Sequence, residues 1–402
     1  MELLTTNNVW MMVCTFLVFF MHLGFTFLEI GLTRQKNSIN ILFKNFFVIT
    51  AGLILYCAIG FNLMYPSEWI IEGVLGLPSP GLDSVGAADL GYNEGYTYWT
   101  DFLFQGMFAA TAATIISGAV AERIKISSFM LIAILYVSIV YPIVGAWKWG
   151  GGFMDALGFY DFAGSTLVHA VGGWGALVVI YFLGARKGRF GKGGGAIPGS
   201  NIPLSAAGVM ILWLGWFGFN GGSELIVSDE ASAIAVSQVF LNTNMAAAGG
   251  VVAALFTSLF LTGKMDVTMA INGAIAGLVA ITAGPSAPSG GAAVLIGAVG
   301  GVIVYFSILF LDKTLKIDDP VGAISAHGIV GIFGVMVVPL TSDASFGMQF
   351  VGVVAIGGFT YVASLITIFV INMVMPIRAT DEEQDMGLDA SEIGVESYPE
   401  FK

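Results

Sequence analysis

Long apolar runs separated by short polar connections occupy nearly the whole chain. Eleven of these runs are long enough, at about 1.5 Å per residue, to cross roughly 30 Å of hydrocarbon as helices. They cover residues 9–31, 41–64, 101–121, 127–146, 163–184, 203–222, 235–262, 267–284, 291–311, 321–340 and 348–375. Backbone groups in lipid must pair within the protein, so such runs predict helices. We therefore expect an all-α, polytopic membrane protein with eleven transmembrane helices.

Two of the runs open with the same pattern. The segments DFAGSTLVHAVGG and DPVGAISAHGIVG, residues 161–173 and 319–331, align without a gap. Their shared positions pair Asp161 with Asp319, Gly164 with Gly322, His169 with His327 and Gly173 with Gly331. Five spans per half is an odd number, so the two helices enter from opposite faces, as in the inverted repeats of transport folds. The pattern predicts an inverted 5+5 repeat, with halves at about 9–184 and 203–340, followed by one helix at about 348–375.

Lysine and arginine gather in alternate connections, which the positive-inside rule places on the cytoplasmic side. These connections hold Arg34, Lys36, Lys44, Arg123, Lys125, Arg186, Lys187, Arg189, Lys192, Lys264, Lys313, Lys316 and Arg378. The stretch 65–100 has neither residue type, and Lys148 is the exception on that side. We expect a multi-pass protein of the cytoplasmic membrane with its N-terminus outside. Residues 1–376 would form the membrane domain, and the acidic segment 377–402 a cytoplasmic tail, either bound to the surface or mobile.

Composition supports a membrane domain and excludes other classes. Only 10% of residues are charged, against about 25% in soluble domains. The net charge of −12 lies largely in loops and tail, so we expect no nucleic-acid partner. The glycine-rich loop 188–199 does not fit a phosphate-binding loop, because Arg186 stands where the first glycine should be and Gly193 where Ser or Thr should be. We expect no cofactor.

The two repeat histidines are the main candidates for function. Each lies eight residues after its aspartate, about 12 Å deep in its helix, so His169 and His327 can meet near the centre of the membrane. Titratable residues inside a membrane are usually functional. Two other interpretations are a pair that only locks two helices together and a metal site, which lacks a third ligand nearby. We favour a pore-lining pair that passes a proton or hydrogen-bonds a small polar solute. His22 has no repeat partner, which favours a structural or entrance role.

Polar and aromatic residues near the predicted helix ends offer further candidates. Asp161 and Asp319 precede their helices as N-caps do. Aromatic residues cluster near the outer side: Phe104, Phe108, Trp147, Trp149, Trp213, Trp216, Phe217 and Phe219, with Ser223 close by. Most would form an interfacial belt and core. A subset that converges with a hydroxyl would form a cation–π cage for a small monovalent cation.

These residues give the chain a resemblance to ammonium transporters of the Amt/Rh superfamily, Amt branch. The matching stretches are GLTRQKN (31–37), GAVAERIKIS (118–127), WGGGF (149–153), DFAGSTLVH (161–169), WFGFNGGS (216–223), NGAIAGLVAITAG (272–284) and the segment around His327. The resemblance implies a homotrimer with a pore in each subunit. It also implies an outer ammonium site of Phe108, Trp149 and Ser223, with Phe104 beside it and Asp161 supporting it. Phe108 and Phe219 would form a stacked gate above the twin histidines His169 and His327.

The implied function is uptake of ammonium. NH4+ would bind at the outer site and lose a proton, and NH3 would cross past the histidines, with or without a separately relayed proton. Two departures from many relatives concern the first span, which contains His22 and Glu29, the latter near the cytoplasmic mouth. In the tail, Ile393 and Val395 stand where His and Glu are common, which weighs against docking of a P-II signalling protein.

Other functions are compatible with the same fold. An ammonium receptor would bind ammonium without transporting it, although no signalling module follows the tail in this sequence. A channel for CO2 or water would show flux that methylammonium does not compete. No nucleophile–base pair or metal triad indicates an enzyme.

Overall fold

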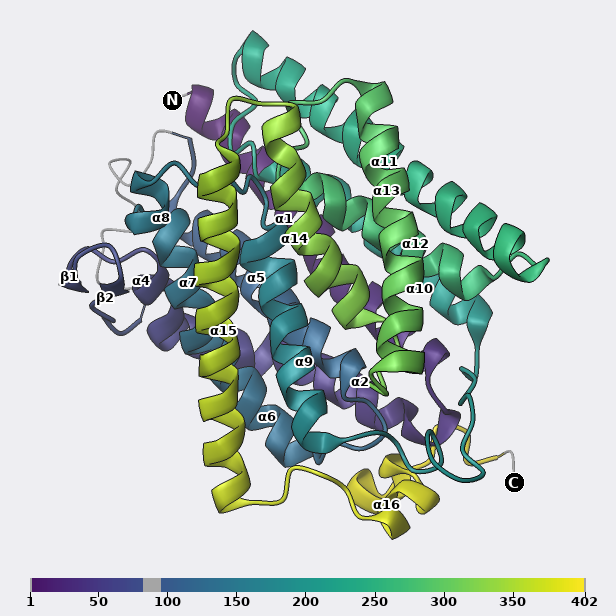
Figure 1. The fold of residues 1–402 in the computed structure, drawn as a ribbon. Coiled ribbons are helices and arrows are strands. Elements are labelled where there is room, and N and C mark those ends of the chain that lie inside the picture. Colours follow the sequence, from purple (N-terminus) through teal and green to yellow (C-terminus); the bar gives the residue numbers. More distant parts are fainter. Residues whose placement is uncertain (1, 82–94, 401–402) are drawn as a thin grey trace.

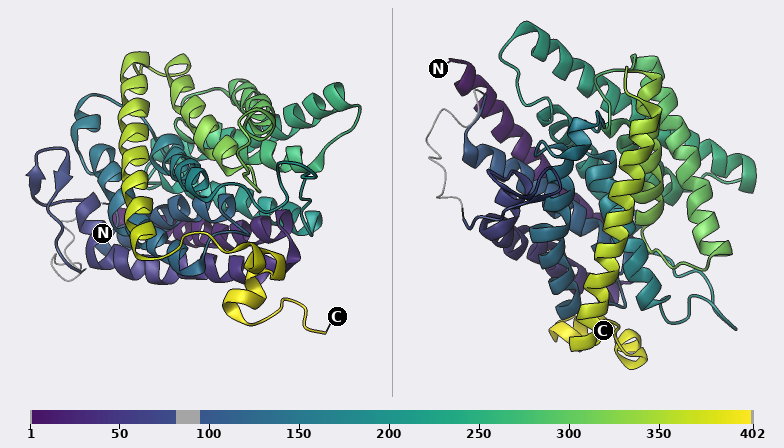
Figure 2. Two further views of the ribbon diagram at one scale, coloured as in Figure 1. Left: turned by 60° about the horizontal axis from the view of Figure 1, so that its bottom comes forward. Right: turned by 60° about the vertical axis from the view of Figure 1, so that its left-hand side comes forward.

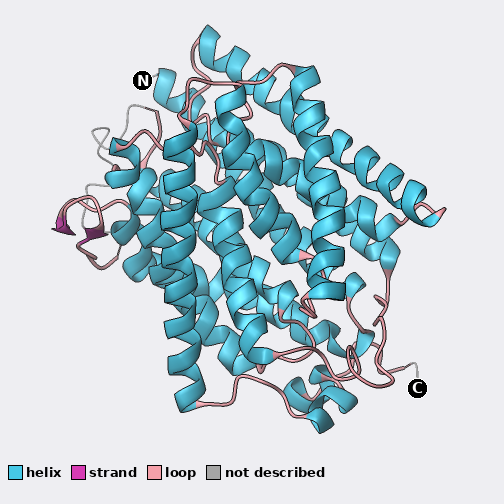
Figure 3. Cartoon of the chain, in the orientation of Figure 1, coloured by secondary structure: helices cyan, strands magenta, loops and turns pink. Residues whose placement is uncertain are grey.

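The structure, a computed structural model, describes residues 2–81 and 95–400. It is a bundle of long helices with a few short connections (Figures 1 and 3). Within the described residues, nine helices are long and apolar enough to span a membrane, and two shorter apolar helices at Val267–Thr282 and Ile324–Leu340 complete the eleven predicted spans. The prediction of an all-helical polytopic membrane protein is confirmed. The chain begins at one end of the bundle and finishes at the opposite end (Figure 1). These are called the N-terminal end and the tail end.

The first five spans are built from helices that several wide or tight turns interrupt. They comprise α1 (Glu2–Leu32), α2 (Ser38–Phe47), α3 (Leu53–Leu55), α4 (Phe61–Met64), α5 (Tyr98–Ala119), α6 (Ile126–Leu135), α7 (Tyr141–Lys148), α8 (Phe153–Ala156) and α9 (Val171–Leu183). The second span starts with a 3₁₀ turn at Gln35–Asn37 and contains π turns at Val48–Gly52 and Tyr56–Gly60, and another π turn, Tyr136–Val140, joins α6 to α7.

Most of the remaining spans contain longer uninterrupted helices, and α14 is the short exception. They comprise α10 (Ile202–Gly222), α11 (Glu230–Thr262), α12 (Val267–Thr282), α13 (Gly290–Leu309), α14 (Val330–Val337) and α15 (Phe346–Val374), with a π turn at Phe310–Thr314 after α13 and a 3₁₀ turn at Val338–Leu340 after α14. Helix α1 packs along α10, and this contact joins the two halves of the repeat. Helix α11 packs against α12 and α13. The tail adds the short helix α16 (Asp381–Met386) and a last turn at Asp389–Ile393.

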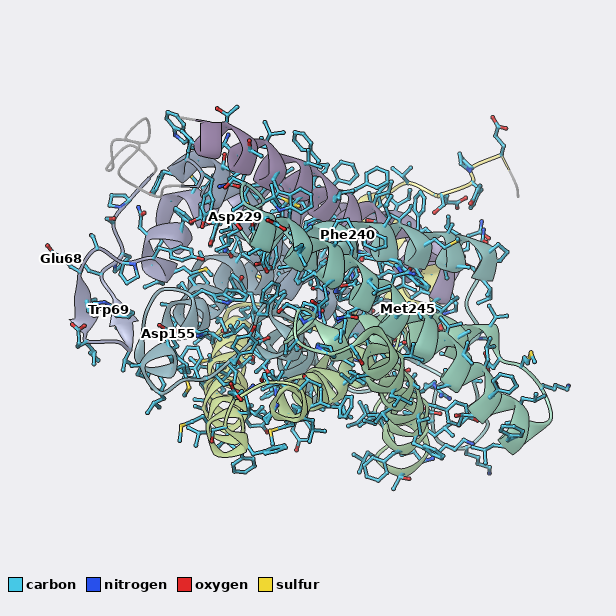
Figure 4. All side chains as sticks on the ribbon, turned by 90° about the horizontal axis from the view of Figure 1, so that it is seen from above. Glu68, Trp69, Asp155, Asp229, Phe240 and Met245 are labelled. Atoms are coloured by element: carbon cyan, nitrogen blue, oxygen red, sulfur yellow. The ribbon has the colours of Figure 1, made fainter. Side chains whose placement is uncertain are left out.

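A small hairpin forms the one β-sheet in the described residues. Strands β1 (Trp69–Ile71) and β2 (Leu75–Gly76) pair antiparallel within the stretch 65–100, of which residues 82–94 lie outside the described part. The hairpin projects from the side of the bundle (Figure 2). Viewed from above, Trp69 lies at the edge near Asp155 (Figure 4), and Gly73 accepts a backbone hydrogen bond from Phe153 at 2.9 Å.

The two repeat aspartates cap the helices that carry the histidines. The Asp161 carboxylate accepts hydrogen bonds from the backbone N–H groups of residues 164–167 at 2.8–3.0 Å. Asp319 accepts in the same way from three N–H groups in its own helix start. The predicted capping is confirmed at both positions. Each cap also requires a left-handed glycine, with φ of 105° at Gly164 and 79° at Gly322.

Both histidines lie in a π-helical turn, which the sequence did not predict. The turns span Ser165–Ala170 and Ile324–Ile329, directly before α9 and α14. In the first turn the His169 N–H bonds to the Gly164 carbonyl, five residues back, at 3.0 Å. Such turns are rare and occur mostly at functional sites. Their matching positions in the two halves extend the repeat from sequence to backbone geometry.

The two histidine helices cross in close contact because glycines remove the side chains between them. A Cβ atom added to Gly173 would lie 2.4 Å from the Gly328 Cα, a distance that real side chains do not reach. From this crossing α9 runs toward the tail end and α14 toward the N-terminal end (Figure 1). The helices therefore enter from opposite ends, as the inverted repeat predicts.

Candidate functional site: a histidine pair between two cavities

The crossing brings His169 and His327 together in the middle of the bundle. Their Nδ1 atoms are 3.2 Å apart, and their rings stack with centroids 5.2 Å apart. Both side chains are buried. A hydrogen bond between two Nδ1 atoms requires one ring to donate and the other to accept, so both rings can be neutral. The pair predicted from the repeat is therefore present as a direct contact.

Apolar and aromatic side chains surround the pair. The His169 ring stacks on Trp216 at 4.9 Å and lies 5.3 Å from Phe219, while His327 lies 6.1 Å from Phe25. The Trp216 indole donates to the Thr282 hydroxyl at 2.8 Å, which fixes the ring against His169. No acidic or basic side chain among the described residues hydrogen-bonds either histidine. The surroundings therefore disfavour an imidazolium and favour the neutral pair.

Two phenyl rings separate the histidines from the N-terminal end. Phe108 of α5 and Phe219 of α10 stack with centroids 4.0 Å apart and planes 16° apart. Both side chains are buried, and Phe219 also contacts His169. The rings thus lie directly against the histidine pair on the side of the N-terminal end.

Above these rings lies a cavity of about 160 Å³, here called the aromatic vestibule. Its lining includes the predicted residues Phe104, Phe108, Trp149 and Ser223. The Phe108 ring contacts Trp149 edge to face, with ring centroids 6.2 Å apart. It also contacts the tilted ring of Phe104, with centroids 4.7 Å apart. The Ser223 hydroxyl donates to the Phe219 carbonyl at 2.9 Å, which leaves its oxygen lone pairs for a donor in the cavity. Ring faces and a hydroxyl are groups that bind a small cation.

Asp161 shapes the vestibule without lining it. Its carboxylate is buried and occupied by the backbone N–H groups of its own helix. Its backbone carbonyl accepts the Trp149 indole N–H at 3.2 Å. Asp161 therefore positions both the histidine helix and the tryptophan.

The sequence interpretation missed several residues of the vestibule. Its lining also includes Tyr65, Tyr96, Asp101, Gln105, Phe162 and Leu225. Asp101 and Gln105 had a signal in the sequence, because with Phe104 and Phe108 they follow the i, i+3, i+4, i+7 spacing of one helix face. They add a carboxylate and an amide beside the aromatic rings.

A second, narrow cavity lies on the tail side of the pair. Its lining consists of Phe25, Leu28, Glu29, Thr114, Ile115, Gly118, Asn272, Ile275, Val321, Ala323, Ala326 and His327, here called the inner cavity. His327 forms one wall, and Glu29 is the one carboxylate on it. The two cavities thus lie on opposite sides of the phenyl and histidine pairs.

His22 lies away from both cavities. It borders an apolar groove of about 240 Å³ between α1 and α2, together with Phe19, Phe20 and Phe46. The structure does not bring His22 to the histidine pair.

A buried ionic network ties the histidine helices together at the tail end. Arg186, just after α9, binds Asp318 at 2.8 Å and Glu122 at 2.6 Å, and Arg34 pairs with Glu122 from the other side. Burial acts to raise the pKa of Asp318, but the hydrogen bonds and charges of Arg186 and Arg123 outweigh it and lower this pKa to about 2. Asp318 is therefore ionised at neutral pH.

The tail is bound to the surface of the bundle, which decides between the two predicted alternatives. The Asp389 carboxylate accepts the backbone N–H groups of Ile39 and Asn40 at 3.0 and 2.8 Å and so caps α2. Glu392 accepts the Ile126 N–H at 3.0 Å, and Lys187 pairs with Asp385 at 2.5 Å. The tail thus joins three of the basic connections.

The fold and site together define a class of protein: a membrane-spanning helical bundle with an internal, histidine-centred route between two cavities, as in channel-like transporters. A sequence model of the Ammonium Transporter Family matches residues 9–398. The chain belongs to this family, whose members transport ammonium and are not enzymes.

Relatives in sequence and structure agree with this assignment. Ammonium transporter Amt2 of Archaeoglobus fulgidus is 37% identical over 433 residues, with 99% of this chain and 89% of that protein covered. The solved structure of a protein named Sensor Amt Protein has a TM-score of 0.89 at 34% identity, covering 97% of this chain and 98% of that one. The crystal structure of Candida albicans Mep2 has a TM-score of 0.82 at 27% identity, covering 94% and 87%.

Proposed function

We propose that this protein takes up ammonium across the cytoplasmic membrane, with the N-terminal end outside and the tail end in the cytoplasm. The direct contact between His169 and His327 carries the proposal, because two buried imidazoles within hydrogen-bond distance can pass a proton while apolar side chains surround them. The basic residues of the tail end support this orientation.

Recruitment occurs in the aromatic vestibule. NH4+ binds to the faces of Phe108 and Trp149 and donates a hydrogen bond to Ser223, with Phe104 behind Phe108. Asp101 adds a negative charge to the same cavity. These contacts favour a small cation over a neutral solute such as CO2.

Deprotonation follows from the desolvation that the route imposes. Below the vestibule the stacked Phe108 and Phe219 rings exclude water, and a cation without water or a counter-charge loses its proton more readily. The NH3 that forms is small and uncharged, and it passes the rings and the histidine pair. The proton moves separately through the Nδ1–Nδ1 contact.

Assembly and regulation follow the family resemblance. We propose a homotrimer with one pore per subunit, embedded in membrane lipid. The tail, held against the bundle, forms part of a cytoplasmic surface that a P-II-type regulator can contact. Ile393 and Val395 in this tail differ from the family pattern. Methylammonium serves as a substrate analogue.

Purified protein in liposomes tests the function. Ammonium chloride added outside should produce a current that methylammonium competes, while protein-free liposomes give none. A silent protein that still binds ammonium would reject transport.

That outcome would support the second candidate, an ammonium sensor with little or no transport. The specific observation in its favour is the close structural match to the protein named Sensor Amt Protein.

A further inference from the structure

A buried carboxylate on the inner cavity has no part in the mechanism so far. Glu29 of α1 is 1% exposed and shares the cavity wall with His327. A lone carboxylate at this depth is costly and is usually kept for function. Its position on the route makes it the first titratable side chain below the histidine pair among the described residues of the cavity.

Neighbouring side chains hold the Glu29 carboxylate in place. The Ser117 hydroxyl donates to it at 2.7 Å and the Asn45 amide at 3.3 Å. Thr114 donates to the Asn45 carbonyl oxygen at 2.6 Å, so the Asn45 NH₂ group is the one that faces Glu29. A carboxylate has about four acceptor positions, and these two donors leave capacity on the cavity side.

A buried lysine stands behind the carboxylate without pairing directly with it. Lys44 of α2 is fully buried, and its Nζ donates to the Ser117 carbonyl at 2.8 Å and lies 5.1 Å from the centre of the Phe129 ring. Ser117 therefore contacts Glu29 through its hydroxyl and Lys44 through its carbonyl. The side chains of α2 and α5 that hydrogen-bond Glu29 in the described structure, Asn45 and Ser117, are neutral. The charged or titratable groups beside it are Lys44 on α2 and His327 on the cavity wall.

The lining of the inner cavity also offers a second acceptor. Asn272 of α12 is 6% exposed, and its Oδ1 has no hydrogen-bond partner among the described residues. It lines the inner cavity with Glu29. A carboxylate and an open amide oxygen in one small cavity match a donor-only ligand, and NH4+ is such a ligand.

We propose that Glu29 and Asn272 form an inner ammonium site, where Glu29 returns a proton to the arriving ammonia. The proton released in the vestibule passes the histidine pair and binds the Glu29 carboxylate. The carboxylic acid then gives it to NH3: the O–H bond breaks, an N–H bond forms, and the restored carboxylate pairs with NH4+ until the ion leaves. This step rests on the proposed function and deepens it.

Glu29→Gln tests the step, because it keeps the side-chain shape and removes the exchangeable proton. In proteoliposomes given ammonium chloride, the variant should lose current by about 100-fold, the scale of a lost acid–base group, while wild-type methylammonium binding persists. Glu29→Asp should retain current with a shifted pH profile. The matched control is Glu230→Gln at the exposed first residue of α11, which should conduct as the wild type does. Wild-type current and pH profile in Glu29→Gln would overturn the proposal.

Infrared difference spectra on adding ammonium chloride separate this proposal from the proposed function. A carboxyl band that changes in the wild type and vanishes in Glu29→Gln supports the inner site even if the wild type carries no current. A wild type that conducts but shows no such Glu29 band overturns the inner site and leaves ammonium transport in place.

Discussion

We expect single residues to decide which solutes the vestibule accepts. Trp149 presents its ring to Phe108 and is fixed by the Asp161 carbonyl, so its orientation is set before a cation arrives. Preorganised ring faces make a cation–π contact worth about 1–2 kcal/mol when water is excluded.

Trp149→Leu should therefore raise KM for methylammonium uptake by about tenfold, since about 1.4 kcal/mol corresponds to a factor of ten, with little change in kcat. Isotope uptake into proteoliposomes measures both constants. Trp213→Leu is the matched control, because this indole bonds Asn244 away from the vestibule. An unchanged KM in Trp149→Leu would remove the cation–π role from the vestibule.

Much of the site was predictable at the scale of residues. The alignment of the two repeat segments directly predicted that His169 and His327 correspond. Asp101 and Gln105 were recoverable from helical spacing. The shared cavity of Glu29 and Asn272 was not, because these residues lie on α1 and α12, and no local pattern connects positions so far apart in the chain.

Two helix starts set the geometry of the conduit at the scale of elements. The aspartate caps and the left-handed glycines begin each histidine helix, and the π turns then orient the rings. The caps were predictable from an aspartate before an apolar run. The π turns were not, because a hydrogen bond five residues back depends on tertiary packing rather than on residue type.

The helix crossing gives the sharpest test of this geometry. Gly173→Ala places a Cβ atom 2.4 Å from the Gly328 Cα, so the helices must separate and the histidine contact must lengthen. We expect loss of most ammonium-dependent current in folded, membrane-inserted protein. Gly358→Ala in α15 is the control, because its Cβ would meet nothing within 4 Å. Normal current in Gly173→Ala would show that close crossing is dispensable.

The whole molecule is held at the tail end by charges that connect distant parts of the chain. Arg186 joins the end of α9 to Asp318, which precedes the second histidine helix. The lysine and arginine residues of these connections were visible in the sequence, but we interpreted them only as evidence of membrane orientation. Their buried partners Glu122 and Asp318 come from other connections, which the positive-inside rule does not address.

Asp318→Asn should lower the free energy of unfolding by about 3 kcal/mol, because it removes one of the two carboxylates that pair with the buried Arg186 and leaves Glu122 to balance both Arg186 and Arg34. The lowered pKa of Asp318 adds a pH dependence. Its stabilisation is complete above the ordinary value of 3.8 and is lost as the pH falls toward about 2. Thermal unfolding in detergent across this range measures both effects, and a wild-type melting temperature in Asp318→Asn at neutral pH would contradict the expectation.

The Nδ1–Nδ1 contact has a consequence for traffic through the centre. One hydrogen shared by two rings fixes both tautomers: the donor ring has a bare Nε2, and the acceptor ring carries hydrogen on its own Nε2. A proton that passes from one ring to the other leaves the two tautomers exchanged. The two rings then stay in the exchanged tautomers. A second proton can cross in the same direction only after both rings have returned to their first tautomers.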